Sequence, residues 1–305
     1  MGRVSAVADR ITSVVLGRPA TRAVRACGPL PRARILRAGC GLLESVIVDR
    51  EGRLFFTSQT WEGRGRGALL RLDAPDAAPV PVAVGIESPG GLALADDGRL
   101  ILGFGDSPAG GLVGNVSPRA GLLLVDPAGG GAEPWVSGLG MANGVARAPD
   151  GTVFASNDFG AHLDRVAPDG TVQRRWAKVP SANGLVVDPT GRYLYAAQTF
   201  TRAAIRRVEI AHPENVTTHA RPPVAAALSL LDGLAIDDAG RLYVAANGAG
   251  QVWRVEPDGA ICAIARDLGS PSAVTVGLRD SPFPAGNVYA VTFGGDVIEL
   301  ETTGN

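Results

Sequence analysis

A short apolar run, a glycine turn and a second β-rich run recur six times along the chain. The six copies begin at residues 44, 90, 143, 183, 232 and 272, the last being degenerate. In each clear copy an apolar strand of four to six residues leads into an Asp-Gly or x-Gly-Arg turn, and a second strand follows. Two apolar runs joined by such a turn are typical of a β-hairpin.

The spacing of the copies indicates how the hairpins are assembled. Successive copies lie 46, 53, 40, 49 and 40 residues apart, which is the period of a four-stranded propeller blade. Room for a third and a fourth strand is clear in the fifth copy, where residues 251–256 and 260–266 flank a Pro-Asp-Gly turn. No long helical periodicity is present. The pattern predicts an all-β six-bladed β-propeller with four antiparallel strands per blade.

The last repeat contains only three strand-like segments, so the ring needs a strand from elsewhere. We expect residues 34–38 to supply it, which closes the ring with an N-terminal strand and makes 34–305 a single propeller domain. Residues 1–33 form a basic leader. Its apolar positions Val4, Val7, Ile11 and Val14 are three and four residues apart, a spacing that predicts a short amphipathic capping helix.

Charge is distributed unevenly although the formal net charge is only −1. The first 40 residues carry a net charge of +7 and the remainder −8, so the acidic main body is not expected to bind nucleic acid. The leader either docks onto that body or binds a membrane surface or a partner. No apolar run approaches the ~20 residues of a membrane span, and we expect a monomer or a weak homo-oligomer.

Three cysteines, Cys27, Cys40 and Cys262, are an odd number without Cys-x-x-Cys spacing. This usage supports neither a disulfide framework nor a thiolate zinc site, and it predicts a cytoplasmic protein. Serine-hydrolase elbows, phosphate-binding P-loops and His-Glu-x-x-His zinc motifs are absent from the sequence. Any catalysis therefore needs another chemistry.

The first residue of each repeat is informative because the innermost strands of a propeller converge on one axis. Four of the six positions carry oxygen donors, namely Glu44, Asn143, Asn183 and Asp232. Carboxylate and amide oxygens are the ligands that Ca²⁺ prefers in proteins. The alternative is that Asn-Gly and Asp-Gly are ordinary turn dipeptides. Their recurrence in phase with the repeat favours a metal site on the axis.

From about residue 35 onward the chain resembles the SMP-30/gluconolactonase/luciferin-regenerating-enzyme-like family, whose wider relatives include lactonases and calcium-dependent paraoxonases. The resemblance is carried by segments 44–45, 142–144, 181–185, 231–235 and 271–274. It implies that Glu44, Asn183 and Asp232 are metal ligands, and that Asn143 is a fourth ligand or binds substrate. An arginine substrate clamp of that family is not found.

Polar residues of the third repeat complete the candidate site. The segment 155–158 resembles the channel-facing end of a strand in paraoxonase-like members, and His162 follows it near the expected mouth. We therefore expect Asn143, Asn157 and His162 to bind substrate, and Asp232 or Asp158 to accept a proton in catalysis.

The leading hypothesis is hydrolysis of a small lactone or ester, in which a divalent cation polarises the carbonyl for attack by water. Ca²⁺ suits the oxygen ligands best, and Zn²⁺, Mn²⁺ or Mg²⁺ are alternatives. One rival hypothesis keeps the metal but assigns a cyclase, isomerase or lyase reaction of specialised metabolism. The other is a non-catalytic interaction propeller, for which an axial ring of oxygen donors has no purpose.

Overall fold

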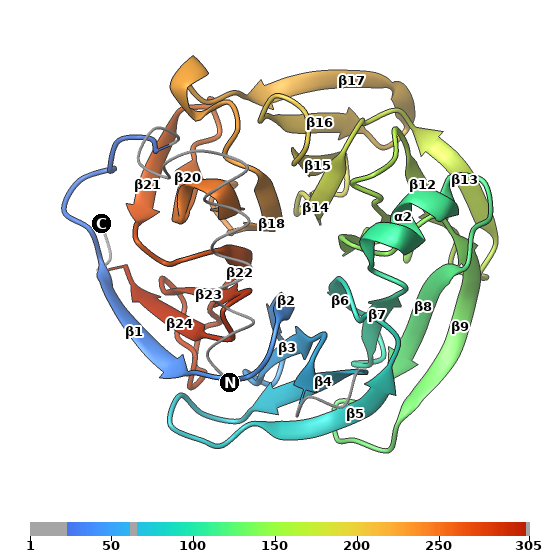
Figure 1. Ribbon diagram of the computed structural model, residues 1–305, viewed down its shortest axis with the longest axis horizontal. Helices are drawn as coiled ribbons and strands as arrows, with labels where there is room; N and C mark the ends of the chain where they lie inside the picture. The colour runs from blue at the N-terminus through green and yellow to red at the C-terminus, as the bar shows by residue number, and fades with distance from the viewer. Residues whose placement is uncertain (1–22, 62–65, 303–305) are drawn as a thin grey trace.

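Six four-stranded antiparallel sheets are arranged around a central axis (Figure 1). The structure is a computed structural model, and it describes residues 23–61 and 66–302. Each sheet runs from an innermost strand near the axis to an outermost strand at the rim. The predicted six-bladed β-propeller is confirmed.

The strands follow one another outward in five blades. Blades 1 to 3 comprise β2 (Leu43–Val48), β3 (Leu54–Ser58), β4 (Gly67–Leu72) and β5 (Val80–Ile86); β6 (Leu92–Leu94), β7 (Leu100–Phe104), β8 (Ala120–Val125) and β9 (Ala132–Leu139); and β10 (Val145–Arg147), β11 (Val153–Ala155), β12 (Leu163–Val166) and β13 (Val172–Ala177). Blades 4 and 5 comprise β14 (Ala182–Val187), β15 (Tyr193–Gln198), β16 (Ile205–Glu209) and β17 (His212–Ala220); and β18 (Leu231–Ile236), β19 (Leu242–Ala246), β20 (Gln251–Val255) and β21 (Ile261–Ala265).

The sixth blade joins the two ends of the propeller. It contains β22 (Pro271–Val276), β23 (Val288–Thr292) and β24 (Val297–Glu301), and β1 (Arg32–Arg37) is its outermost strand. β1 and β24 are antiparallel. The expected closure by an N-terminal strand is therefore confirmed, whereas the expected capping helix lies in residues 1–22, outside the described part of the chain.

The hydrophobic core lies between neighbouring blades, and this explains why several strands are apolar throughout. Adjacent residues of a strand point to opposite faces of the sheet. In β3, Phe56 joins the core shared with the sixth blade, while Phe55 joins the core shared with the second. Both rings are fully buried. Each inner strand thus packs on two neighbours, which holds its end rigidly at the axis.

The α-helix α2 (Pro108–Gly114) lies in the long connection between β7 and β8. Ser107 caps it by accepting a hydrogen bond from the backbone N–H of Gly110 at 3.1 Å, and proline follows at the first helical position, where it is well tolerated. Within residues 66–302, two short 3₁₀ turns also occur, η3 (Val224–Ala226) and η4 (Asn247–Ala249). The helix has only seven residues, three of which are glycine. Such a short segment shows no helical periodicity, so the sequence did not predict α2.

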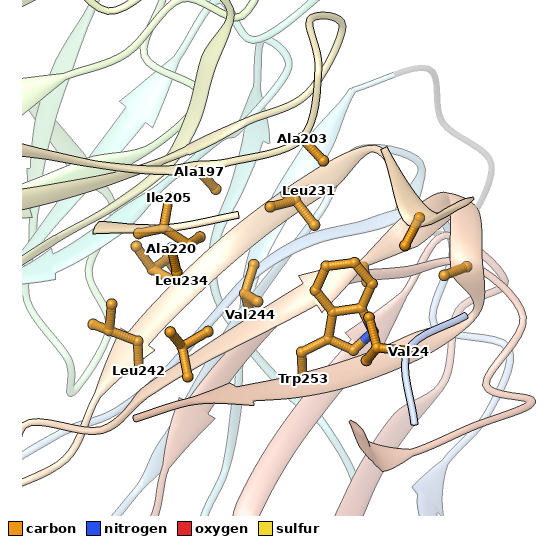
Figure 2. Close-up of a cluster of buried hydrophobic side chains, with 14 of the residues drawn as sticks. Val24, Ala197, Ala203, Ile205, Ala220, Leu231, Leu234, Leu242, Val244 and Trp253 are labelled. Atoms are coloured by element: carbon orange, nitrogen blue, oxygen red, sulfur yellow. The ribbon is translucent and has the colours of Figure 1, made fainter. Parts of the chain in front are cut away.

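The chain before β1 is fastened to the fifth blade by a disulfide between Cys27 and Cys262. The expectation of unpaired cysteines is therefore wrong for this pair, and the argument from cysteines for a cytoplasmic location is lost. The two residues are 235 positions apart, and only the fold brings them together. Val24 is buried beside Trp253 in the same region (Figure 2). Cys40 is a buried free thiol.

A candidate metal centre on the propeller axis

A cavity of about 310 Å³ opens on the axis at one end of the propeller. It is lined by residues from all six blades, which form an oxygen-rich floor and a largely apolar wall. The lining residues are Leu42, Glu44, Gln59, Asp106, Pro108, Met141, Asn143, Asp158, Phe159, Asn183, Thr199, Phe200, Leu230, Asp232, Asn247 and Phe293. Five of the seven predicted site residues are among them, namely Glu44, Asn143, Asp158, Asn183 and Asp232.

The residues near the axis form two rings that follow from the hairpin geometry, a first ring at the starts of the first strands and a second ring at the ends of the second strands. In each blade the start of the first strand lies beside the end of the second, because the two strands are antiparallel. Glu44, Asn183 and Asp232 are the second residues of β2, β14 and β18. The ends of the second strands supply the other ring, in which Gln59, Asp106, Asp158, Phe200, Asn247 and Phe293 each follow their strand by one to three residues.

The same backbone irregularity presents the predicted ligands in three blades. In β2, β14 and β18 the pairing with the next strand shifts by one residue at the start of the strand. The shift spans Glu44, Asn183 and Asp232, one in each blade. Such β-bulges redirect a side chain and are common beside active sites. Here they set three oxygen-bearing side chains at equivalent positions around one axis.

The glycines after Asn143, Asn183 and Asp232 serve close packing of the blades, whereas Ser45 follows Glu44. A Cβ atom at Gly184 would lie 2.4 Å from the carbonyl oxygen of Asp232, and one at Gly144 would lie 2.2 Å from that of Asn183. Asn183-Gly184 also lies within β14. Asp232-Gly233 lies within β18 in the same way, whereas Asn143-Gly144 is a bend directly before β10. The first two pairs are therefore not turn dipeptides, and the glycines of all three pairs let adjacent strands approach.

The two carboxyl groups at the starts of the first strands, those of Glu44 and Asp232, have strongly raised pKa values. Burial raises the pKa of Glu44 well above its usual range, and the neighbouring carboxylates of Asp106, Asp232 and Asp158 raise it further. Burial likewise raises the pKa of Asp232, with further contributions from Asp158 and Asp106. Four acidic groups thus repel one another across a buried space, which is the electrostatic condition that a bound cation relieves.

Asp106 and Asp158 of the second ring are also buried carboxyl groups. Burial raises the pKa of Asp106 to about 8, although hydrogen bonds from Asn143 and Gln59 oppose the shift. Burial raises the pKa of Asp158 to about 7. Within the described chain, Oδ1 of Asp158 has no hydrogen-bond partner. An unpartnered buried oxygen at the cavity is costly unless a ligand satisfies it.

Amide side chains support the carboxyl groups from the sides. Nδ2 of Asn143 donates to Oδ1 of Asp106 at 3.1 Å, and Nε2 of Gln59 donates to Oδ2 of Asp106 at 3.0 Å. Nδ2 of Asn247 donates to Oδ2 of Asp232 at 3.4 Å, and Asn183 also hydrogen bonds this carboxyl group. Because the nitrogen atoms serve the carboxyl groups, the amide oxygens of Asn143 and Asn183 remain available as acceptors.

This donor set fits a hard divalent cation. The candidate ligands Glu44, Asn143, Asn183 and Asp232 offer only oxygen atoms, as Ca²⁺ and Mg²⁺ prefer. Among the described residues, no three Asp, Glu, His or Cys side chains are close enough to form a metal site by themselves. A site built here therefore depends on the two asparagine oxygens as well as on the two carboxylates.

Asn157 and His162, the other two predicted site residues, do not line the cavity. Nδ2 of Asn157 donates to the carbonyl of Gly111 at 2.9 Å, and its Oδ1 accepts from the backbone N–H of Phe159. These bonds fix α2 against the third blade. His162 is partly exposed, and burial and the nearby Arg175 lower its pKa. Neither residue faces a substrate placed in the cavity.

The sequence analysis overlooked Asp106, Gln59 and Asn247. Each of them is a polar residue one or two positions after the second strand of its repeat. The first residue of the same repeat is Gly90 for Asp106, Glu44 for Gln59 and Asp232 for Asn247. The end of the second strand therefore carries information about the site that the first residue of each repeat does not contain.

Comparison with known proteins places this geometry in a family context. The model of the SMP-30/Gluconolactonase/LRE-like region matches residues 155–280, which confirms the resemblance expected from the sequence. No curated protein sequence matches the chain. Within the described residues, no helix has the length and apolar character needed to cross a bilayer.

Several solved structures share the fold. A gluconolactonase from Xanthomonas campestris has a TM-score of 0.69 and 18% identity, over 93% of this chain and 99% of that one. The calcium-binding protein regucalcin from Agrobacterium tumefaciens has a TM-score of 0.69 and 18% identity, over 89% and 94%. Virginiamycin B lyase from Staphylococcus aureus has a TM-score of 0.57 and 11% identity, over 88% and 98%.

Proposed function

We propose that this chain, which carries an SMP-30/Gluconolactonase/LRE-like region over residues 155–280, is a divalent-cation-dependent hydrolase of small lactones or esters. The observation that carries the proposal is the convergence of four buried carboxyl groups on one axial cavity that no lysine, arginine or histidine of the described chain lines. The similar fold of a gluconolactonase and of a calcium-binding protein supports it.

Glu44, Asn183 and Asp232 would hold the cation, with Asn143 as a fourth ligand, and Ca²⁺ suits their oxygen atoms best. When bound, the cation would polarise a substrate carbonyl and lower the pKa of water. Zn²⁺, Mn²⁺ or Mg²⁺ are possible replacements in vitro. The chain's own contribution is to fix these oxygens by bulges and amide hydrogen bonds before substrate arrives.

Asp158 is the best candidate for the proton acceptor. Its Oδ1 has no partner among the described residues and belongs to a cavity-lining side chain. Burial raises its pKa to about 7 in the metal-free protein, and a bound cation would lower that pKa, so the carboxylate would be ionised and able to accept a proton at neutral pH. Asp232 was the other candidate, but it would be occupied as a ligand.

The test is hydrolysis of a lactone and ester panel in a pH-stat, before and after chelation. We expect activity to disappear with EDTA and to return with Ca²⁺. Asp232→Ala should lose both bound metal and activity. Asp158→Asn removes a charge that acts on Glu44 and Asp232 and should weaken metal binding, and at saturating Ca²⁺ it should still lack most of kcat. Asp238→Asn removes a carboxylate from an exposed turn and is the matched control. Full activity in a demonstrably metal-free protein would overturn the proposal.

The experiment also separates the rival reactions. Hydrolysis by direct attack of water in H₂¹⁸O places the label in the product acid during a single turnover. Inactivity on the whole panel, with metal bound at the axis, would favour a cyclase, isomerase or lyase. A propeller that binds no metal at all would favour the non-catalytic interaction role.

A further inference from the structure

The polar floor of the axial cavity consists mainly of hydrogen-bond acceptors and acidic groups. The side-chain donors in the lining belong to Gln59, Thr199 and three asparagines. Gln59 and Asn143 donate to Asp106, and Asn183 and Asn247 hydrogen bond Asp232. The Thr199 hydroxyl donates to the carbonyl of Leu231 at 2.6 Å. An anionic substrate would therefore meet mostly negative charge, and the hydroxyl groups of a substrate could find partners only at this floor.

The wall and mouth of the same cavity are apolar. Phe159 of the third blade and Phe200 of the fourth pack together with their ring centroids 5.1 Å apart. Leu42, Met141, Leu230 and Phe293 continue the apolar lining around the axis. Aromatic and aliphatic groups in a concave site gain free energy when they remove apolar ligand surface from water.

The apolar wall is tightly packed on the side of α2 and open to solvent at the mouth. A Cβ atom at Gly111 of α2 would lie 2.7 Å from Sδ of Met141 and 2.9 Å from the ring of Phe159, so the helix packs tightly against both side chains. Phe200 remains 55% exposed at the mouth. A phenylalanine that lines a cavity and still faces water can gain further burial from a bound ligand.

We propose that the substrate of this site is a neutral lactone or ester bearing an apolar alkyl or aryl substituent, and not a polyhydroxylated sugar lactone. The carbonyl would lie over the oxygen-rich floor, and the substituent would lie along Phe159 and Phe200. The inference rests on the proposed hydrolase function and specifies its substrate class. It departs from the substrate that the name gluconolactonase gives for one structure of the same fold.

Three six-membered lactones test this directly, since they share the ring and differ in what it carries. δ-Decanolactone has an alkyl chain, δ-valerolactone has no substituent, and glucono-δ-lactone has hydroxyl groups. With Ca²⁺ present, and after correction for spontaneous hydrolysis, we expect kcat/KM for δ-decanolactone to exceed that for either other lactone by about tenfold or more. A higher kcat/KM for glucono-δ-lactone overturns the inference and leaves the hydrolase function intact.

Variants identify the surface that binds the substituent. Phe200→Ala should lower kcat/KM for δ-decanolactone about tenfold and lower it much less for δ-valerolactone, while Phe200→Leu should retain most of the selectivity. Val84→Ala, at an exposed position of the outer strand β5, should leave both values unchanged. Equal losses for both lactones in Phe200→Ala would contradict the assignment.

Binding of non-hydrolysed lactams separates failure of the inference from failure of the proposed function. Calorimetry should give a Kd for the pentyl-substituted δ-lactam about tenfold below that of unsubstituted δ-valerolactam, and Phe200→Ala should remove the difference. Equal affinities overturn the inference whether or not any lactone is hydrolysed. Selective lactam binding without hydrolysis of any lactone would support the pocket assignment and overturn the hydrolase function.

Discussion

The side-chain amide of Asn143 donates a hydrogen bond to Oδ1 of Asp106 at 3.1 Å and so joins the third blade to the second inside the axial cavity. The second oxygen of Asp106 accepts from Gln59 of the first blade. One buried carboxyl group therefore orients amides from two neighbouring blades. Through Asn143 it acts on the candidate metal site without being one of the predicted ligands.

Replacing this carboxyl group should weaken metal binding. Asp106→Asn keeps the shape but removes a negative charge that acts on Glu44 and Asp232, and it loses the acceptor for one of the two amides. We expect the Kd for Ca²⁺ to rise by about tenfold or more, as measured by calorimetry. Asp238→Asn makes the same charge change on an exposed turn and should leave the Kd unchanged. Equal affinities in the two variants would remove Asp106 from the site.

A second prediction concerns the close approach of the innermost strands. Gly184→Ala would place a methyl group 2.4 Å from the carbonyl oxygen of Asp232 and 2.6 Å from the backbone nitrogen of Leu234. Backbone atoms of a central strand cannot move aside easily, so we expect a loss of about 1–3 kcal/mol in the free energy of unfolding and weaker Ca²⁺ binding. Chemical denaturation and calorimetry measure the two effects.

The control for this variant is Gly28→Ala. Nothing lies within 4 Å of a Cβ atom at Gly28, so the same substitution should change neither stability nor metal affinity. If Gly184→Ala were as stable as Gly28→Ala, the blades would not be in the close contact described here.

The predictability of the fold and of the site differed for a physical reason. Propeller blades repeat because each must bury both faces against an equivalent neighbour, so the hairpin pattern and the missing strand of the last blade could be seen in the sequence. The Asn-Gly and Asp-Gly pairs stood out for the same reason. Asp106 did not, because the residues that follow each second strand differ in type and in distance from the strand.

The Cys27–Cys262 disulfide could not be deduced either. An odd cysteine count leaves the pairing open, and the two thiols meet only because the chain before β1 lies along the edge of the fifth blade. Likewise, Asn157 adjoins Asp158 in sequence, but its amide bonds to Gly111 and Phe159 instead of facing the cavity. Contacts made across blades decide both cases, and no local pattern encodes them.

The buried carboxyl groups predict how the stability of the metal-free protein depends on pH. Burial raises the pKa of Asp106 to about 8 and that of Asp158 to about 7, against about 4 for an aspartate in an unfolded chain. Between these values the folded state binds protons that the unfolded state releases, so stability must fall as pH rises. We expect the melting temperature to drop by roughly 5 °C or more between pH 5.5 and 8.5.

Two controls test whether these carboxyl groups cause the fall in melting temperature with pH. Saturating Ca²⁺ should flatten it, because a bound cation stabilises the ionised carboxylates and removes the penalty. Asp158→Asn should flatten the part near pH 7, since the variant has no proton to lose there, and Asp238→Asn should have no effect. A melting temperature that rises steadily from pH 5.5 to 8.5 in the metal-free protein would contradict the raised pKa values.

The last prediction concerns the segment that fastens the N-terminal side of the propeller to the fifth blade. Val24 is buried against Trp253, its backbone N–H donates to Oε1 of Gln251 at 3.0 Å, and its carbonyl accepts from Arg266 at 2.9 Å. The Cys27–Cys262 bond fixes the next turn of chain. Cys27→Ser should therefore cost about 2–4 kcal/mol, since the unfolded chain loses a constraint and the folded segment loses an anchor.

Thermal unfolding with and without a reductant separates the disulfide from simple packing. The wild-type protein should lose roughly 5–10 °C in melting temperature on reduction, and Cys27→Ser should start at the lower value and show no further change. Val24→Ala tests the packing contact alone and should remain sensitive to reductant. Thiol titration of the denatured protein should find one free thiol, that of Cys40, before reduction and three afterwards. Three free thiols in the unreduced protein would show that the bond does not form, and the melting temperature would then be independent of reductant.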